Sequence, residues 1–450
     1  MKKRVFCLWL LLCCCFSFIR VYAEEAVETT PPATVSESYA VIDADSGQVY
    51  ISKNASVQKY PASITKILTL ALFFEKTGGS MEGTLTVSQT AIDALEYGAS
   101  TIALQPGEVI SLEDAVMATA LMSANDAANC LAEYTAGSLP AFADMMNRKL
   151  EEIGCTGTHF VNPNGLHDPQ HYTTAADMAA ITRYALTVPG VLTALSTDSY
   201  LMRPTNLQSE ERPFGTGHAM FVQSTYTYEG ALGGKTGWTP EARHTMVTVA
   251  ERGGRRLICV VMDSPQKWDK YKDTIALLDY CFDTFQQVEY PSQEIPSFTM
   301  AVYQDGEYIG KVTAVTPVCT FALHKTVALQ DVVWRYEDVP KTLAPGDTAQ
   351  PYIAFYLKGE VPSMQNALPR FAMPVQGMEA CVAKAGGQSI EQAKEPFTVP
   401  GWVWPVGGIF VLFAVLYGIR RFNLYRRKLR HRARMLARRQ AIAAGSVRRT

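Results

Sequence analysis

The chain has 450 residues and a formal net charge of −2, but this charge is unevenly distributed. The last 31 residues hold 12 Lys or Arg and no acid, and the first 23 residues hold four basic residues and no acid. Without these two ends, residues 24–419 carry a net charge of −18. A strongly acidic body has no electrostatic footprint for nucleic acid, so we expect no nucleic-acid partner.

The N-terminal segment has the pattern of a secretory signal peptide. Residues 1–23 begin with Lys2-Lys3-Arg4, continue through a short apolar stretch and end on Val21-Tyr22-Ala23. An uncleaved N-terminal anchor is the alternative, but the apolar run is short for a spanning helix. Residues 24–37 are rich in Pro, Thr and Glu, and we expect them to form a disordered linker.

Residues 38–288 are predicted to form one α+β domain. Two strands, at 39–43 and 48–52, are joined by Asp45-Ser46-Gly47, which is a hairpin signal. Residues 63–76 are apolar nearly all round, which predicts a helix buried at the centre of the domain. Further elements are expected in chain order as helices at 88–96, 112–122, 126–136, 139–153 and 174–184, strands at 231–236, 244–250 and 257–263, and a helix at 268–285. The N-terminal and C-terminal strands are expected to share one antiparallel sheet.

The hydrophobic pattern of the sequence changes after residue 288. Residues 290–375 consist of short alternating segments, such as FTMAVY and YIAFYLKG, which predict a small β-domain. Residues 376–400 are predicted to be a linker.

The C-terminal end predicts a membrane anchor. Residues 402–419 are almost entirely apolar, long enough for a bilayer crossing, and carry aromatic residues near both ends. The basic tail at 420–450 should stay in the cytoplasm and lie on anionic lipid. A buried core helix and a nucleic-acid-binding tail are the alternatives. We therefore expect a single-pass protein of a bacterial cell membrane, with residues 38–375 on the extracytoplasmic side.

Six cysteines remain after removal of the predicted signal peptide. No two of them lie in a CxxC or metal-like spacing, and a core of this size needs no disulfide, so we expect free buried thiols. We also find no metal-ligand spacing and no phosphate-binding loop, and expect neither metal nor cofactor.

Acyl transfer by a serine without histidine requires a nearby amine to take the proton, and Ser-x-x-Lys on a helix places the two side chains on one face. The chain has three such tetrads, which begin at Ser56, Ser63 and Ser264. Ser56 lies in a loop and Ser264 precedes a proline at a strand end. Ser63 stands in the first turn of the predicted buried helix, just after Pro61, so we assign the nucleophile to Ser63 and the base to Lys66.

Two partner motifs are selected in the same way. Ser-x-Asn occurs at 52–54 on the hairpin and at Ser123-Ala-Asn125 between two helices, where a polar turn can face a cleft. Lys-Thr-Gly occurs at 76–78 as a helix stop and at 235–237 at the end of a Gly-rich strand, where substrate can lie alongside. The second copy of each motif completes an ordered set with Ser63 and Lys66.

This set resembles the low-molecular-mass penicillin-binding proteins, the serine D-Ala-D-Ala carboxypeptidases. The surrounding stretches AVIDADSGQVYISKNA, YPASITKILT, LMSANDAA, NPNGLHDPQHYTTAADMA and GALGGKTGWTPEA agree with it. The resemblance covers residues 36–285 and, weakly, the following β-domain. It implies a penicillin-binding/β-lactamase-like fold, with an antiparallel sheet and a helical subdomain. It also implies removal of the terminal D-alanine from peptidoglycan stem peptides and covalent inhibition by β-lactams.

The resemblance implies a role for each matching residue. Ser63 would be the nucleophile, Lys66 the general base in its neutral form, and Ser123 the relay of the proton to the departing D-alanine. Burial and a nearby cation would lower the pKa of Lys66. The backbone N–H groups of Ser63 and Trp238 would form the oxyanion hole. The expected substrate-binding residues are Asn125, Lys235, Thr236, Gly237 and Trp238.

Some positions stand apart from these roles. His167, His171 and Asp177 lie near a predicted helix start, where capping or packing is the better interpretation. The chain departs from the family at Ala242-Arg243-His244, where relatives usually carry Ala-Gly and an aromatic residue.

Three alternative functions remain open. A class A β-lactamase uses the same three motifs but deacylates with a Glu, and no Glu occurs from Ile153 to Ser209. A D,D-endopeptidase shares the chemistry. A catalytically silent membrane-anchored scaffold is the alternative outside the enzymes.

Overall fold

The computed structural model describes residues 30–344, 347, 350–359 and 368–376. Within these ranges no helix combines the length and the apolar character needed to cross a membrane. The predicted signal peptide, the predicted linker at 376–400 beyond its first residue, the predicted spanning segment at 402–419 and the basic tail lie outside the described residues.

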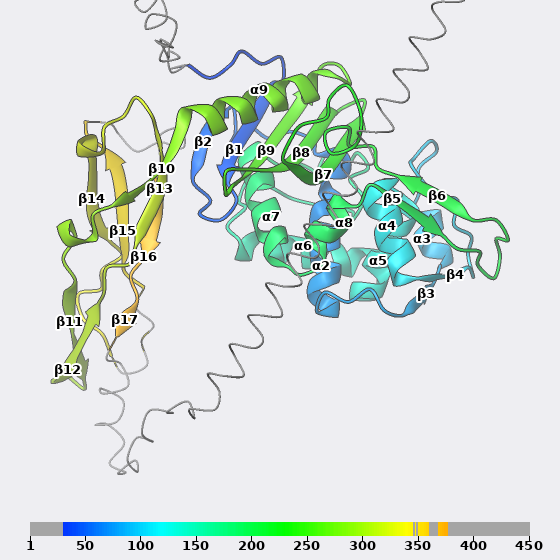
Figure 1. The fold of residues 1–450 in the computed structure, drawn as a ribbon. Coiled ribbons are helices and arrows are strands. Elements are labelled where there is room, and N and C mark those ends of the chain that lie inside the picture. The colour runs from blue at the N-terminus through cyan, green and yellow to red at the C-terminus, as the bar shows by residue number, and fades with distance from the viewer. Residues whose placement is uncertain (1–29, 345–346, 348–349, 360–367, 377–450) are drawn as a thin grey trace, which may run out of the picture. The chain divides into compact units, whose positions relative to one another are not determined.

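A five-stranded antiparallel sheet forms the centre of the first domain (Figure 1). Its strand order is β2 (Val49–Lys53), β1 (Ser38–Asp43), β9 (Arg255–Ser264), β8 (Arg243–Arg252) and β7 (Ala231–Thr239). The two N-terminal strands therefore join the three C-terminal strands in one sheet, as the sequence predicted. The pairing of β1 with β9 connects the two ends of the domain.

Successive residues of the central strands point into two different cores. Ala40 and Ile42 of β1 belong to the core shared with the helices on one face, whereas Tyr39 and Val41 face the core beneath α9 (Asp269–Thr284). This alternation follows from the two-residue period of a strand. Figure 1 shows α9 along one face of the sheet and α7 on the other.

The helical subdomain surrounds α2 (Lys66–Thr77), in which every residue from Lys66 to Phe74 is buried. The helix ends at Gly78, whose φ of 63° is the left-handed conformation of a glycine cap. The surrounding helices are α3 (Gln89–Asp93), α4 (Leu112–Leu121), α5 (Asn125–Ala136), α6 (Leu139–Glu152), α7 (Ala175–Thr187) and α8 (Val191–Ser196).

Several local features differ from the sequence-based expectation. The helix predicted from residue 63 begins as a 3₁₀ turn at Ala62–Thr65, and α2 starts only at Lys66. The hydroxyl of Thr174 caps α7 by accepting from the backbone N–H of Asp177, but the Asp177 side chain does not bond back to Thr174. Two short hairpins were not predicted, because strands of three or four residues are too short to show a period. The six-residue helix α8 was not predicted either. These hairpins are β3 (Thr84–Thr86) with β4 (Val109–Ser111), and β5 (Ser199–Met202) with β6 (Arg212–Gly215).

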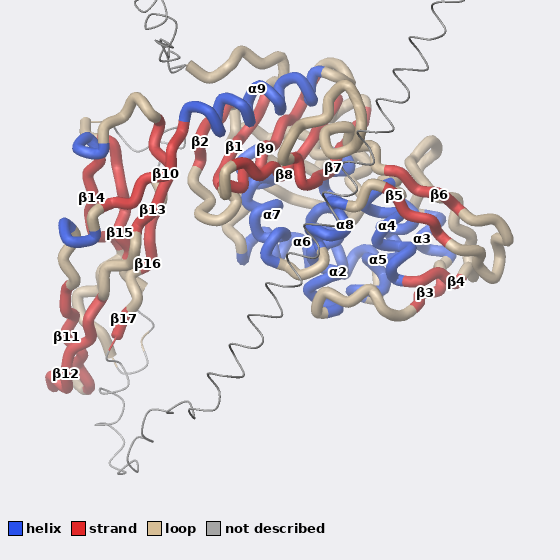
Figure 2. Tube along the Cα trace, viewed as in Figure 1, coloured by secondary structure: helices blue, strands red, loops and turns tan. Residues whose placement is uncertain are grey.

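The second part of the chain is the predicted small β-domain. Figure 2 shows that strands and loops build almost all of it. Its strands form three small sheets around a core of their own, which includes Phe321, Ile353 and Phe355. The sheets are β10 (Phe285–Tyr290) with β13 (Cys319–His324); β11 (Phe298–Gln304), β12 (Glu307–Ala314) and β17 (Val375–Gln376); and β14 (Val332–Glu337), β15 (Tyr352–Leu357) and β16 (Arg370–Ala372). Strand β10 follows α9 directly and crosses the predicted boundary at 288–290.

The five described cysteines are free and buried, as expected; Cys381 lies outside the described residues. Burial raises the pKa of the Cys130, Cys155 and Cys259 thiols to about 12, so these groups are unreactive at neutral pH. Among the described residues no cluster of His, Cys, Asp or Glu could hold a metal ion.

The last residues of the predicted linker at 24–37 form hydrogen bonds with the first domain. Ser36 is fully buried, and both its backbone N–H and its hydroxyl donate to Oδ2 of Asp273 on α9, at 2.8 and 2.5 Å. Its hydroxyl also lies 2.6 Å from that of Ser264. The linker therefore ends before Ser36 rather than at residue 37. Composition could not show this, because the ordering group is an aspartate more than 200 residues away.

We predict that Asp273→Ala lowers the free energy of unfolding by about 2 kcal/mol, because it leaves the buried donors of Ser36 without their charged acceptor. The measurement is chemical denaturation of a fragment that comprises residues 30–376. Asp283→Ala is the matched control on the same helix. Among the described residues its exposed carboxylate forms an ion pair only with Arg252, so the substitution should change stability by less than about 1 kcal/mol. Equal effects of the two variants would contradict the role of Asp273.

Candidate active site

The three motifs meet at one place, although they lie far apart in the sequence. Nζ of Lys66 lies 3.1 Å from Oγ of Ser63 and donates to Oδ1 of Asn125 at 2.6 Å. Nζ of Lys235 donates to Oγ of Ser123 at 2.9 Å. The start of α2, the turn before α5 and strand β7 thus each supply part of one polar cluster.

Ser63 is held by a turn that cannot easily relax. Ala62, which precedes it, has φ of +51°, a conformation rare for residues other than glycine. The hydroxyl of Thr65 donates to the carbonyl of Ala62 at 2.9 Å, and that of Thr245 on β8 donates to the carbonyl of Pro61 at 2.8 Å. Gly165 packs on the same turn, where a Cβ would lie only 2.0 Å from the Ala62 carbonyl oxygen. These contacts fix the direction of the serine hydroxyl.

Lys66 has no exposed surface. Besides Ser63 and Asn125, its Nζ contacts the carbonyl oxygen of Asn164 at 2.6 Å. Burial, and then the charge of Lys235, hold the pKa of Lys66 well below its usual value. A neutral amine beside a serine hydroxyl is the arrangement that a general base requires.

Ser123 and Lys235 form the opposite wall. Ser123 has φ of +56°, a strained conformation for a serine, and this directs its hydroxyl to Lys235. Lys235 is 3% exposed. Burial, and then the charge of Lys270 on α9, lower the pKa of Lys235 to about 7. An anion bound against Lys235 would restore its charge.

Strand β7 forms the edge along which a ligand can lie. A Cβ on Gly237 would lie 2.8 Å from the backbone nitrogen of Ser63, so only glycine allows this close approach. Thr236 is half-buried, and Trp238 is 58% exposed and packs against His244. The cleft beside them has a volume of about 480 Å³ and is lined by Ser63, Asn125, Asn164, Trp238 and Glu241, among others.

The residues that hold the Asn164 carbonyl against Lys66 were not predicted from the sequence. Asn164 is buried, and its side chain donates to Asn129 on α5 at 2.9 Å. The hydroxyl of Thr69 on α2 donates to the carbonyl of Pro163 at 2.6 Å, which fixes the turn at 162–165. The Asn-Pro-Asn-Gly sequence signals such a turn, but nothing in it indicates that a backbone carbonyl reaches Lys66.

His171 has the packing role that the sequence favoured. It is buried, accepts from the backbone N–H of Val161 through Nδ1, and lies 2.9 Å from the Thr65 hydroxyl through Nε2. Burial lowers its pKa to about 3, so it is neutral and supports the turn that carries Ser63. Asp177 accepts from the N–H of Gly157 and the hydroxyl of Thr158.

The motif copies that were set aside lie elsewhere. Ser56 is exposed in a loop, and Ser264 is buried against Ser36 at the end of β9. The first Lys-Thr-Gly ends α2 at Gly78. Arg243, where the family resemblance leads one to expect glycine, has φ of +55°, a conformation that glycine adopts more easily than other residues.

Comparison with known proteins agrees with this geometry. The sequence profile of a family described as D-alanyl-D-alanine carboxypeptidase matches residues 25–266. The chain is 30% identical over 266 residues to D-alanyl-D-alanine carboxypeptidase DacF of Bacillus subtilis, a match that covers 58% of this chain and 66% of DacF. It is also 30% identical over 262 residues to DacB2 of Mycobacterium tuberculosis, covering 56% of this chain and 84% of DacB2.

The fold is similar to that of penicillin binding protein 5 from Haemophilus influenzae. The TM-score is 0.60 at 24% identity, and the match covers 77% of this chain and 98% of that one. This share exceeds residues 38–288, so the similarity of fold extends into the small β-domain.

The buried lysines Lys66, Lys235 and Lys270 predict a pH dependence of Ser63 acylation. Lys270→Gln removes a charge that lowers the pKa of Lys235, so Lys235 should stay protonated to higher pH. If charged Lys235 binds the carboxylate of an acylating probe such as a penicillin, the rate of Ser63 acylation falls as pH rises through the pKa of Lys235. The descending limb of this pH–rate profile should therefore move to higher pH in Lys270→Gln. Lys272→Gln, exposed on the same helix, should leave the profile unchanged. An unmoved or lowered limb in Lys270→Gln would refute the coupling.

Proposed function

The chain belongs to the D-alanyl-D-alanine carboxypeptidase family, and from this premise we propose that it removes the terminal D-alanine from peptidoglycan stem peptides. The reaction proceeds through an acyl-enzyme on Ser63, and β-lactams inhibit it covalently. The observation that carries the proposal is the fully buried Lys66 amine within 3.1 Å of the Ser63 hydroxyl.

Acylation begins with the substrate's free carboxylate against Lys235 and Thr236. Ser63 Oγ attacks the carbonyl carbon between the two D-alanines, while neutral Lys66 takes the hydroxyl proton. The backbone N–H groups of Ser63 and Trp238 stabilise the oxyanion of the tetrahedral intermediate. The C–N bond then breaks, and the leaving amine receives a proton through Ser123, which lies at hydrogen-bond distance from Lys235. Free D-alanine departs.

Deacylation requires a water that a base near the ester activates. A class A β-lactamase uses a glutamate for this step, but here the carbonyl of Asn164 contacts Lys66 from the 162–165 turn. Lys66 and Ser123 therefore activate the water once D-alanine has left space for it. A penicillin's leaving amine stays tethered through the opened ring and occupies that space. This favours turnover of the peptide over turnover of the penicillin, and hence a carboxypeptidase over a β-lactamase.

The nucleophile can be tested with its own sequence neighbours. Ser63→Ala should abolish labelling by a fluorescent penicillin and D-alanine release from a peptide that ends in D-Ala-D-Ala, because the attacking oxygen is lost. Ser56→Ala is the matched control: it removes the serine of another Ser-x-x-Lys tetrad on an exposed loop, and should keep both activities. Labelling that persists in Ser63→Ala would show that the site assignment is wrong.

We also propose that residues 402–419 cross a bacterial cell membrane, with the catalytic domain outside and the basic tail inside. The support comes from the sequence: an apolar run of spanning length, aromatic residues near its ends and a tail with 12 Lys or Arg and no acid.

Protease added to intact protoplasts should release a soluble, penicillin-binding fragment and leave the tail protected. The lipid bilayer shields a cytoplasmic tail, whereas the extracytoplasmic linker stays open to cleavage. An epitope placed after Thr450 and another before Ser36 report the two sides by immunoblot. Digestion of the tail together with the domain would support an anchor that lies on the membrane without crossing it.

A further inference from the structure

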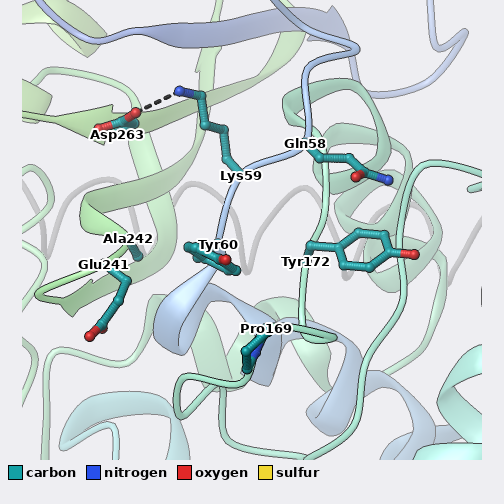
Figure 3. A pocket seen from close by; sticks show the side chains of 8 residues that line it. All are labelled: Gln58, Lys59, Tyr60, Pro169, Tyr172, Glu241, Ala242 and Asp263. Carbon is teal, nitrogen blue, oxygen red and sulfur yellow. Dashed lines mark hydrogen bonds and ion pairs between the residues drawn. The ribbon is translucent and has the colours of Figure 1, made fainter.

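A buried acid beside the candidate active site has no cation as a partner. Asp126 stands in the first turn of α5, directly after Asn125, and has no exposed surface. It forms no ion pair among the described residues. Figure 3 shows a contrasting carboxylate in a nearby pocket, that of Asp263, which pairs with Lys59 at 2.6 Å. A buried carboxylate without a cation is costly unless hydrogen bonds replace those it made with water.

The partners of Asp126 are backbone N–H groups. Its Oδ2 accepts from Ile102 and from Leu104, both at 3.1 Å, and its Oδ1 accepts from Ala127 at 2.9 Å. Ile102 and Leu104 are buried and belong to no helix or strand. Among the described residues no other group accepts from their two N–H groups. Asp126 therefore supplies the acceptors that a helix or a sheet would otherwise provide for this segment.

The segment before Ile102 forms a wall of the cleft. Residues 96–100 line the cleft, and the carbonyl of Ser100 accepts from the backbone N–H of Asn125 at 2.7 Å. Tyr97 is fully exposed, so its ring does not anchor this wall. Ala103 has φ of +58°, a conformation that persists only where the surrounding structure holds it. Hydrogen bonds to the start of α5 thus fix the wall in place.

The same carboxylate acts on Lys66 through its charge. Asn125, the neighbour of Asp126 in the chain, accepts from Nζ of Lys66 at 2.6 Å. Burial lowers the pKa of Lys66 and the charge of Lys235 lowers it further, whereas the charge of Asp126 raises it. In the described part of the chain, no other acid raises the pKa of Lys66.

The other titratable groups around these side chains do not cancel this effect. Burial lowers the pKa of His171 to about 3 and raises that of the Cys130 thiol to about 12, so both groups are neutral. The carboxylate of Glu108 pairs with Arg212. The charges on α5 and β7 therefore act on the Lys66 amine in opposite directions.

We propose that Asp126 is a positioning residue of the acyl-transfer site, which fixes the 96–104 wall to α5 and supports proton transfer to Lys66 by its charge. When Oγ of Ser63 attacks, its proton moves to the amine of Lys66 and creates an ammonium. A carboxylate nearby stabilises this ammonium in the low-dielectric interior. Asp126 contacts neither substrate nor reacting atoms and acts through Lys66 and the wall. The proposal rests on the proposed acyl-enzyme chemistry.

The role of the charge can be tested by pH. Asp126→Asn keeps the size of the side chain but removes its charge, so the pKa of Lys66 should fall. Acylation of Ser63 by a fluorescent penicillin requires the neutral amine, so its rate constant rises as pH rises through the pKa of Lys66. This ascending limb should move to lower pH in Asp126→Asn. The maximal rate constant should fall about tenfold, because the amine is a weaker base and the wall is held less well.

Asp114→Asn is the matched control. Asp114 is also a buried acid in the first turn of a helix, α4, where it forms a capping box with Ser111. It does not act on Lys66, so the ascending limb should stay at the wild-type pH even if the variant is less stable. Active-site titration with the penicillin gives rate constants per folded site, so a loss of folded protein does not affect the comparison.

Hydrogen exchange of the unaltered full chain tests the wall without any substitution. Measured by mass spectrometry, the N–H groups of Ile102 and Leu104 should exchange slowly, because they are buried and bonded to Asp126. The exposed residues 209–211, which also lie outside helices and strands, are the control and should exchange fast.

The outcomes separate this proposal from the proposed function. An ascending limb that stays in place or rises in Asp126→Asn, or that Asp114→Asn shifts equally, overturns the role of Asp126. Fast exchange at Ile102 and Leu104 also overturns it. In either case, D-alanine release by the wild-type protein still supports the carboxypeptidase. A wild-type protein that labels with penicillin but releases no D-alanine overturns the proposed function, while the pH profiles still decide the role of Asp126 in acylation.

Discussion

A lysine side chain with no exposed surface is the constraint on which the structure of this site depends. An isolated ammonium in a protein interior costs several kcal/mol, so Lys66 needs acceptors on every side or must give up its proton. The fold supplies Ser63, Asn125 and the carbonyl of Asn164 as acceptors, from three segments far apart in the sequence. Burial, and then the charge of Lys235, nevertheless hold the pKa of Lys66 well below its usual value. Under the proposed function, this lowered pKa allows Lys66 to act as the base.

Holding those acceptors in place introduces local strain. Ala62 and Ser123 both have positive φ, and each directly precedes or belongs to a motif that faces the cleft. Strain of this kind, typically 1–3 kcal/mol at each residue, persists only where the surrounding structure holds it. Here the support comes from β8, through Thr245, and from Gly165, whose missing side chain makes room for the turn at Ala62. The rigid five-stranded sheet thus positions a serine that lies outside it.

The cleft is electrically asymmetric along β7. Its inner end carries two buried lysines, Lys235 and Lys270, and burial lowers their pKa values to about 7 and about 8. At its outer end lies Glu241, which has no ion pair among the described residues. Under the proposed function, the substrate's free carboxylate binds at the inner end, against Lys235. Orientation is then set before the scissile carbonyl reaches Ser63, which is the geometric requirement of an acyl transfer.

The sequence by itself determined the elements whose signal is local. The apolar run at 63–76 predicted the buried helix, alternation predicted the central sheet and the small β-domain, and the place of Ser63 in the first turn of that helix selected it among three candidate serines. Tertiary structure decided what depends on distant segments: the 3₁₀ turn at Ala62, the carbonyl of Asn164 on Lys66, and the ordering of Ser36 by Asp273. The physical reason is the same in each case. A backbone carbonyl or a backbone torsion carries no residue-type signal, and Lys66 and Asn164 are 98 residues apart, so only folding brings them into contact.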